Sequence, residues 1–242
     1  MYQYNDDSLM LHNDLYQINM AESYWNDGIH ERIAVFDLYF RKMPFNSGYA
    51  VFNGLKRVVN FIENFGFTNE DITYLKSIGY KEDFLNYLKD LKFSGNIKSM
   101  QEGEICFGNE PLLRVEAPLI QAQLIETILL NIINFQTLIA TKASRIRQIA
   151  THDTLMEFGT RRAQEIDAAL WGARAAFIGG FDSTSNVRAG KLFNIPVSGT
   201  HAHALVQTYG DEYIAFKKYA ERHKNCVFLV DTFHTLKSGV PI

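Results

Sequence analysis

Residues 198–204 read SGTHAHA, and the two histidines in this stretch, His201 and His203, are the first candidates for chemistry in the chain. A neutral imidazole exposed at the end of a strand can act as a nucleophile and accept a phosphoryl group. The same pair could instead bind a metal ion, with Asp231 and His234 of the later DTFH stretch completing the ligand set. In a third interpretation, both histidines lie at the start of a helix and have neither role. The spacing alone leaves these three interpretations open.

Other polar stretches contain groups that suit a charged substrate. FGTRR, which contains Arg161, places guanidinium groups and backbone N–H groups at a predicted helix start, where anions bind. DSTSN at 182–186 could hold a carboxylate or phosphate, although capping of a helix by Ser183 or Thr184 is the commoner use of such a stretch. Asp231 could bind magnesium or stabilise positive charge that develops on a sugar, or it could cap a helix.

The elements that must position these residues are predicted from a change of pattern near residue 120. A long helical pattern covers 121–149, and short apolar runs then alternate with helical segments, which predicts a parallel sheet with crossover helices. The four predicted strands are 154–158, 176–180, 195–199 and 226–231. A polar stretch follows each strand, and active sites of α/β proteins lie at the carboxyl ends of parallel strands. The sequence therefore predicts a catalytic edge suited to a polyanionic substrate, such as a phosphorylated sugar.

Residues 1–120 are predicted to form an N-terminal α+β domain, and residues 121–242 a second domain. In the first domain we expect helices at 11–27, beginning at Asn13 or Asp14, at 81–91 and after a capping box at 68–71, and strands at 34–44 and 110–118. The second domain has about four strand–helix units, whereas a closed barrel typically has about eight. Since half a barrel would expose an unpaired strand edge, we expect the second domain to be incomplete and the chain to be truncated.

Composition excludes several classes of protein. The 242 residues are 47% hydrophobic and 21% charged, with a formal net charge of −3, so the chain lacks the basic excess of a nucleic-acid binder. Cys106 and Cys226 are too few for a disulfide framework or a zinc knuckle. The N-terminal residues have no signal-peptide pattern, and the most apolar window, 119–133, is interrupted by two glutamines and Glu126. We therefore expect a cytoplasmic protein that binds neither nucleic acid nor membrane.

Many stretches in order along the whole chain resemble the nicotinate phosphoribosyltransferase family. The similar segments are HNDLYQINMA (12–21), FDLYFRKMPFNSGYAVFNGL (36–55), EPLLRVEAP (110–118), MEFGTRRAQ (156–164), GGFDSTSNVRAG (179–190), IPVSGTHAH (195–203) and LVDTFHTLKSGVP (229–241). The resemblance implies an α/β fold in which an N-terminal α+β domain precedes the first part of an irregular (β/α) barrel of the type II phosphoribosyltransferase kind. It also implies an ATP-coupled reaction of nicotinate with phosphoribosyl pyrophosphate, which gives nicotinate mononucleotide and pyrophosphate in NAD salvage.

The resemblance also assigns roles to individual residues. His203 matches the histidine that ATP phosphorylates, which makes His201 a neighbour and not a ligand, and Asp231 matches an acidic position that acts at the ribosyl–pyrophosphate end of the substrate. Other matched residues are expected to bind nicotinate (Tyr16, Phe158, Ser185, Thr200) or phosphate groups of phosphoribosyl pyrophosphate (Arg41, Arg161). Tyr16 and Arg41 are expected to reach the site from the other subunit of a homodimer. The implied cofactors are ATP and the Mg²⁺ that accompanies the substrate pyrophosphate, with no resident metal.

Ser185 bears on specificity, because related nicotinamide-using enzymes carry an acidic residue at the similar position. Neutral groups there tolerate the carboxylate of nicotinate far better than an acidic group would. The chain departs from the family pattern at His234, where relatives often carry Asp, and it lacks the later Arg-x-Asp-Ser-Gly-Asp motif and a Gly-rich phosphate loop. We therefore expect it to be the N-terminal half of such an enzyme and to be inactive or impaired alone. The alternatives are a metal-dependent hydrolase that uses His201 and His203, and a non-catalytic truncated paralogue that dimerises with or regulates a longer partner.

Overall fold

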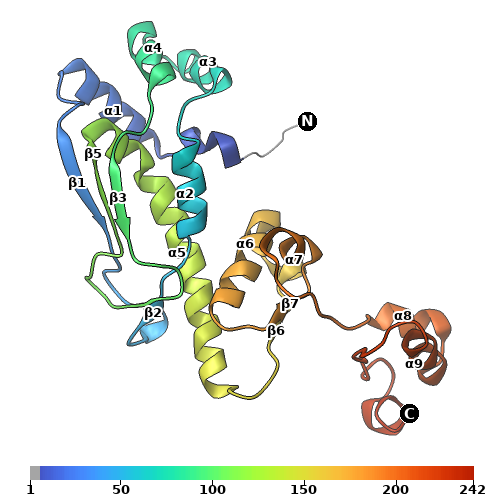
Figure 1. The fold of residues 1–242 in the computed structure, drawn as a ribbon. Helices are drawn as coiled ribbons and strands as arrows, with labels where there is room; N and C mark the ends of the chain where they lie inside the picture. Colours follow the sequence, from blue (N-terminus) through green and yellow to red (C-terminus); the bar gives the residue numbers. More distant parts are fainter. Residues whose placement is uncertain (1–5) are drawn as a thin grey trace. The chain divides into compact units, whose positions relative to one another are not determined.

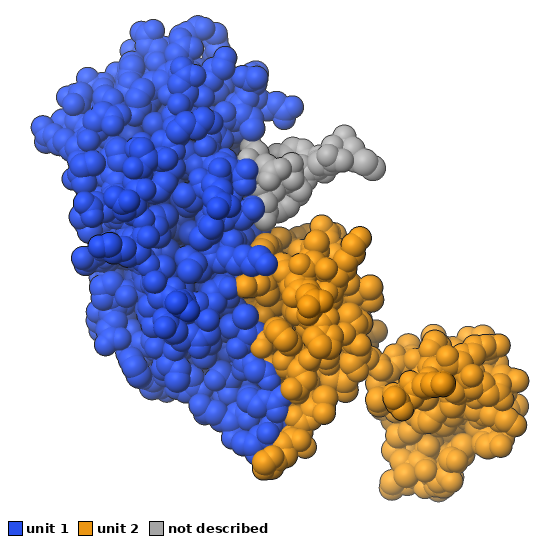
Figure 2. Space-filling model, in the orientation of Figure 1, with its two compact units in different colours: residues 1–151, 178–180 blue, residues 152–177, 181–242 orange. Residues whose placement is uncertain are grey.

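The computed structural model describes residues 6–242, which divide into two compact units (Figure 2). Unit 1 extends to Thr151 and takes in Ile178–Gly180, and unit 2 comprises His152–Phe177 and Phe181–Ile242. The boundary between the two units lies after residue 151 and not at residue 120, because the long helix that follows residue 120 packs with the N-terminal elements. The domain boundary expected at residue 120 stays a prediction.

A three-stranded antiparallel sheet in the order β1-β5-β3 is the framework of unit 1 (Figure 1). β1 (Ile33–Leu38) pairs along its whole length with β5 (Leu113–Pro118), and β3 (Asn96–Ser99) pairs with the other edge of β5. Along β5 the side chains alternate between buried and exposed, as expected for a strand with one face on the core. On the exposed face, Arg114 donates two hydrogen bonds to Asp37 of β1, at 2.7 and 2.8 Å.

The long helix α5 (Leu119–Ile149) packs against the sheet, α1 (Leu15–Asn26) and α2 (Leu55–Glu63). Buried apolar residues of its N-terminal half belong to the hydrophobic cluster that forms the core of unit 1, and include Ile120, Leu124, Ile125, Ile128 and Ile133. Two hydroxyls on α5 also hold the chain near residue 52. Thr141 accepts a hydrogen bond from the main-chain N–H of Val51 at 2.9 Å, and Thr137 accepts one from Asn53 at 3.1 Å. The helix predicted at 121–149 is confirmed.

Within residues 6–242, α5 is the single helix that is long and apolar enough to cross a membrane. Of its most apolar window, 56% is buried inside the protein. Gln121, one of the polar residues in that stretch, is buried and accepts a hydrogen bond from the main-chain N–H of Ser94 at 2.8 Å. This burial is typical of the core helix of a folded domain.

The remaining elements of unit 1 are short. The capping box predicted at 68–71 is confirmed: Thr68 Oγ1 accepts a hydrogen bond from the main-chain N–H of Asp71 at 3.1 Å, and Asp71 Oδ2 accepts one from Thr68 at 2.8 Å. The helices predicted at 11–27 and 81–91 correspond to α1 and α4 (Glu82–Asp90), and the strand predicted at 34–44 is the shorter β1. The other elements of unit 1 are η1 (Asp6–Leu11), η2 (Pro44–Asn46), β2 (Ala50–Val51), α3 (Asn69–Ser77) and β4 (Ile105–Cys106).

Unit 2 alternates short parallel strand pairings with helices. β6 (Met156–Glu157) pairs in parallel with β7 (Ser183–Thr184), and single parallel bridges join Thr184 to Val197 and Thr200 to Val227. The parallel arrangement predicted for this region is therefore present, with shorter strands than expected. The helical elements are η3 (Thr160–Arg162), α6 (Glu165–Ile178), α7 (Val187–Phe193), α8 (His203–Tyr209), α9 (Glu212–Ala220) and the single π-helical turn η4 (Thr235–Gly239).

The strand predicted at 176–180 is wrong. Residues 176–178 form the last turn of α6, because the preceding alanine-rich sequence favours a helix that continues through them. The helix ends at Gly179 and Gly180. A Cβ atom at Gly179 would collide with the carbonyl oxygen of Ala140, and Gly180 has a φ of +105°, which glycine adopts readily. The strand of this unit is β7, which lies inside the polar stretch that was expected to follow it.

The helix cap predicted at Ser183 or Thr184 is also wrong, because both residues belong to β7. Asn186 caps α7 instead, and its side chain accepts a hydrogen bond from the main-chain N–H of Ala189 at 3.0 Å.

Candidate functional site

Parallel strand segments of unit 2 bring several polar stretches to one edge. The main-chain N–H of Ser185, directly after β7, donates to the carbonyl of Glu157 at the end of β6 at 2.9 Å. On the other side of β7, Thr184 donates to Pro196 at 3.0 Å and receives a hydrogen bond from the main-chain N–H of Ser198 at 3.1 Å. Since these segments run in the same direction, the FGTRR, TSN and GTHAH stretches all leave the pairing at their carboxyl ends.

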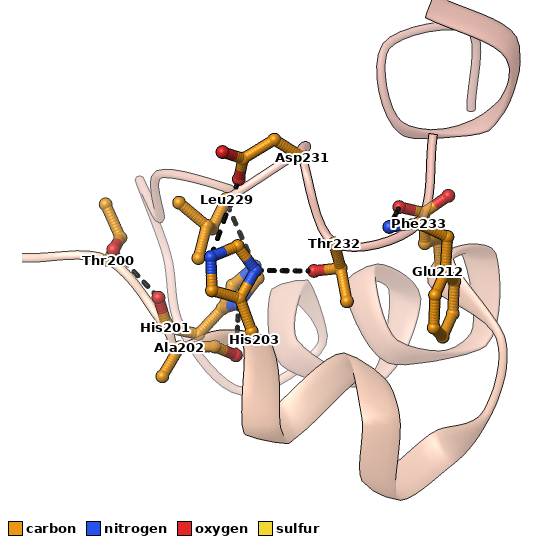
Figure 3. Close-up of polar contacts among 9 residues, drawn as sticks. All are labelled: Thr200, His201, Ala202, His203, Glu212, Leu229, Asp231, Thr232 and Phe233. Atoms are coloured by element: carbon orange, nitrogen blue, oxygen red, sulfur yellow. Dashed lines mark hydrogen bonds and ion pairs between the residues drawn. The ribbon is translucent and has the colours of Figure 1, made fainter. Parts of the chain in front are cut away.

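His203 is the first residue of α8 and its side chain is about half exposed, at 51%. Its Nδ1 atom lies 3.1 Å from the hydroxyl oxygen of Thr232, and its Nε2 atom lies 3.9 Å from the carboxylate of Asp231 (Figure 3). The Asp231 side chain is 58% exposed. The GTHAH and DTFH stretches therefore meet here, where an exposed imidazole, a carboxylate and a hydroxyl are accessible to a ligand.

His201 has a different environment, although it is only two residues away. It is 8% exposed and packs against the rings of Phe216, Tyr219 and Phe228. Its Nε2 atom accepts a hydrogen bond from the main-chain N–H of Leu229 at 3.2 Å, and its Nδ1 atom lies 3.3 Å from the carbonyl oxygen of Ala202 (Figure 3). With both ring nitrogens in contact with the main chain, His201 has no lone pair to offer to a metal.

The metal-ligand set of the hydrolase interpretation is not assembled. His234 accepts a hydrogen bond from the main-chain N–H of Lys237 on Nδ1 at 3.2 Å and so caps η4. Over the part of the chain that the structure describes, no group of three or more His, Cys, Asp or Glu side chains could hold a metal ion. His203 and Asp231 therefore approach each other without His201 and His234, whose side chains bond the main chain instead.

The predicted nicotinate-binding residues of unit 2 lie along the same edge. The Phe158 side chain is 42% exposed, and a Cβ atom added at Gly199 would lie 3.9 Å from its ring. Thr200, next to Gly199, donates a hydrogen bond from its hydroxyl to the carbonyl of His201 at 2.8 Å. Ser185 is half-buried beside the end of β6. The structure therefore brings Phe158 to the start of the GTHAH stretch and places Ser185 beside the strand that leads into Phe158.

Arg161 lies in η3 and is exposed. Only Gly159 separates Phe158 from this single turn, so the guanidinium group is carried by the same loop as the aromatic ring.

Tyr16 and Arg41, the two residues expected to come from a partner subunit, both belong to unit 1. Arg41 lines a cavity of about 450 Å³ bounded by β1, β5 and α5, together with Gln123 and Glu126. The negative charge of Glu126 raises the pKa of the Tyr16 phenol above its ordinary value. Glu126 thus connects the two residues, since it lines the cavity with Arg41 and acts electrostatically on Tyr16.

Three further residues of unit 2 contribute to the site without having been predicted. Thr232 contacts His203, Glu157 joins the ends of β6 and β7, and Glu212 accepts a hydrogen bond from the main-chain N–H of Phe233 at 3.3 Å. The position of Glu157 at the end of a predicted strand, and of Thr232 beside Asp231, were signals that could have singled them out. No comparable signal marks Glu212, which is buried in the first turn of α9.

Comparisons of this chain with a family model and with individual proteins identify the same family. A family model described as the nicotinate phosphoribosyltransferase (NAPRTase) N-terminal domain matches residues 11–134. Nicotinate phosphoribosyltransferase from Bacillus subtilis (strain 168) is 66% identical over 241 residues, which cover 99% of this chain and 49% of that protein. The chain spans about half the length, or less, of the curated relatives that it matches.

Solved structures agree with this assignment. The crystal structure of human nicotinic acid phosphoribosyltransferase is similar with a TM-score of 0.76 at 39% identity, over 81% of this chain and 40% of that one. Nicotinate-nucleotide pyrophosphorylase from Pyrococcus furiosus is similar with a TM-score of 0.79 at 26% identity, over 97% of this chain and 54% of that one. These similarities confirm the predicted fold class, an N-terminal α+β domain followed by the first part of a phosphoribosyltransferase barrel.

Proposed function

This chain belongs to the nicotinate phosphoribosyltransferase family, and on that premise we propose that it takes part in the ATP-coupled synthesis of nicotinate mononucleotide. The substrates are nicotinate and phosphoribosyl pyrophosphate, and the second product is pyrophosphate. The observation that carries the proposal is the half-exposed His203 beside Asp231 and Thr232, at the carboxyl edge of parallel strands.

His203 is the phosphate acceptor in this proposal. A ring nitrogen attacks the γ-phosphorus of ATP, so that a nitrogen–phosphorus bond forms while the phosphorus–oxygen bond to ADP breaks. Thr232 holds the imidazole through Nδ1 at 3.1 Å, which supports one orientation of an otherwise exposed ring. The phosphorylated histidine then favours binding of phosphoribosyl pyrophosphate, and its hydrolysis drives the reaction.

Asp231 acts at the ribosyl end of the substrate. In the transfer step the bond from the ribosyl carbon to pyrophosphate breaks, the ring nitrogen of nicotinate bonds to that carbon, and pyrophosphate leaves. Positive charge develops on the sugar in the transition state, and a carboxylate close to it lowers the barrier. Asp231 suits this role because its exposed carboxylate adjoins His203.

Magnesium fits as an ion that arrives with the substrates. Mg²⁺ is usually held by substrate phosphates, waters and one or two carboxylates, and the described residues offer Asp231 at this edge but no larger acidic cluster. When bound, it would neutralise the charge of the leaving pyrophosphate.

Phe158, Ser185 and Thr200 form the nicotinate pocket. An exposed aromatic ring can stack on the pyridine ring, and the neutral groups of Ser185 and Thr200 accept a carboxylate without like-charge repulsion. The pocket is therefore expected to favour nicotinate over nicotinamide. Arg161, on the same loop as Phe158, binds a phosphate group.

The proposal includes a homodimer to which Tyr16 and Arg41 contribute across the interface. It is supported by the exposure of Tyr16 (51%), Tyr39 (45%) and Leu130 (45%) in unit 1, the last two of which line the cavity that contains Arg41. A cytoplasmic location is the remaining part of the proposal.

The test is a transferase assay on residues 1–242 coexpressed with the part of the Bacillus subtilis relative that they do not match. Formation of nicotinate mononucleotide from nicotinate, phosphoribosyl pyrophosphate and ATP is expected, with nicotinamide a poor substrate. Residues 1–242 alone are expected to be inactive or strongly impaired. A coexpressed pair that binds tightly but forms no product would favour the non-catalytic paralogue.

A further inference from the structure

Glu157 makes hydrogen bonds on both sides of the pocket expected to hold nicotinate. Its Oε1 atom accepts a hydrogen bond from the main-chain N–H of Gly159, and its Oε2 atom accepts one from the hydroxyl of Thr184 at 2.7 Å. Its main-chain carbonyl accepts a third hydrogen bond, from Ser185 at 2.9 Å. One residue therefore links the loop that begins at Phe158 to the end of β7.

The hydrogen bonds continue from Thr184 into α7. The hydroxyl oxygen of Thr184, a fully buried residue, accepts the main-chain N–H of Asn186 at 3.0 Å. The side chain of Asn186 in turn accepts the main-chain N–H of Ala189 at 3.0 Å. The Thr184 hydroxyl thus donates once and accepts once, and a continuous series of hydrogen bonds runs from Gly159 to the first turn of α7.

These bonds flank two of the predicted nicotinate-binding residues. Phe158 lies between Glu157 and Gly159, and Ser185 lies between Thr184 and Asn186. The space beside the carboxylate is also limited, because a Cβ atom at Gly159 would lie 2.6 Å from Glu157 Oε1. The main chain on either side of Phe158 and of Ser185 is therefore held by groups that depend on the Glu157 carboxylate.

With the proposed function as its premise, we propose that Glu157 is a positioning residue that fixes Phe158 and Ser185 relative to each other for nicotinate binding. Its carboxylate oxygens are occupied by donors of the protein itself, so the carboxylate orders the pocket and does not contact the substrate. A carboxylate that faced the pocket would repel nicotinate, and its engagement by Gly159 and Thr184 holds it away. Loss of a hydrogen bond to a charged acceptor typically corresponds to roughly a 10- to 100-fold change in an equilibrium constant.

The coexpressed enzyme described above allows kinetic tests of three variants. Glu157→Ala is expected to raise KM for nicotinate about 10-fold or more, and to leave KM for phosphoribosyl pyrophosphate within about twofold. Glu157→Gln can still accept from Gly159 and can donate its amide to the Thr184 oxygen, so its KM should stay within about threefold of the wild-type value. Gly159→Ala should resemble Glu157→Ala, because the added methyl displaces the carboxylate.

Glu221→Ala is the matched control. Glu221 is an exposed glutamate in unit 2 that pairs with Lys218 at 3.4 Å, away from the strand edge. Its removal should leave both KM values unchanged. If Glu157→Ala folds poorly, the other two variants still test the proposal. It requires nearly normal nicotinate binding in Glu157→Gln and weak nicotinate binding in Gly159→Ala.

Amide hydrogen exchange on residues 1–242 gives a readout that does not depend on activity. In the Glu157→Ala variant the Gly159 amide, which donates to the carboxylate, should exchange about 10-fold faster or more, and in Glu157→Gln it should not. An unchanged KM for nicotinate in a folded Glu157→Ala enzyme would overturn the proposal. If the wild-type pair forms no product, the proposed function fails. The exchange data then decide the structural role of Glu157, and unchanged protection of the Gly159 amide in Glu157→Ala would overturn it.

Discussion

His203 and Thr232 contact each other through Nδ1 and Oγ1 at 3.1 Å, at an exposed edge of unit 2. Two residues earlier, His201 points into a cluster of aromatic rings and accepts a hydrogen bond from Leu229. The two histidines differ because α8 begins at His203, after the extended segment that buries His201. The HxH pair therefore combines one structural histidine with one that is available for chemistry.

Replacing each histidine by alanine should change the free energy of unfolding by different amounts, because one ring is buried and the other is exposed. His201→Ala removes a buried ring and a hydrogen-bond acceptor, and is expected to lower the free energy of unfolding by about 2–4 kcal/mol. His203→Ala removes an exposed side chain and should change it by less than about 0.5 kcal/mol. Urea denaturation of residues 1–242 measures both values. Equal losses in the two variants would show that the assigned environments are wrong.

The ion pair between Asp37 and Arg114 should make the stability of unit 1 depend on pH in the acidic range. Hydrogen bonding to the Arg114 guanidinium lowers the pKa of Asp37. A carboxyl whose pKa is lower in the folded than in the unfolded state stabilises the fold above its unfolded pKa of about 3.9, and this contribution is lost as the pH falls through the folded pKa. The free energy of unfolding of the wild type, measured by urea denaturation, should therefore exceed that of Asp37→Asn by a constant amount above about pH 5. The difference between the two proteins should shrink at lower pH. A difference that grows towards acid pH would contradict this.

The two cysteines should react with thiol reagents at different rates. Burial raises the pKa of the Cys106 thiol to about 11, and the residue has 0% exposure. Since the thiolate is the reactive form, Cys106 should not react in the folded protein near pH 8. Cys226 is only partly buried and should be labelled first. Ellman's reagent on Cys226→Ser tests this directly, because rapid labelling of that variant without denaturant would mean that Cys106 is accessible.

Features decided by neighbouring residues were predictable from the sequence. The Thr68–Asp71 capping box involves residues three apart. Asp14 is the N-cap residue of α1, one of the two starts expected for this helix, although its side chain makes no capping hydrogen bond. The strand expected at 176–180 failed because a short apolar run fits a helix or a strand equally well, and the close approach of Gly179 to Ala140 cannot be seen in the sequence.

Contacts between distant residues explain what the sequence did not show about the site. Thr184 and Glu157 are 27 residues apart, and Thr232 and His203 are 29 apart. The alternation of strands predicted that these stretches share an edge, but the partners of individual atoms depend on strand register. The burial of His201 likewise depends on Phe216 of α9 and on Phe228, which the HxH spacing does not reveal.

Phosphate transfer from ATP to His203 is the step on which the proposed function depends. Residues 1–242, coexpressed with the unmatched part of the Bacillus subtilis relative, would be incubated with γ-labelled ATP and digested, and the acid-labile label would be located. We expect the label on the peptide that contains His203, its loss in His203→Gln, and a reduction of about 3- to 10-fold in Thr232→Val. Label that persists in His203→Gln, or an active enzyme that never carries phosphate on this residue, would contradict the role of His203.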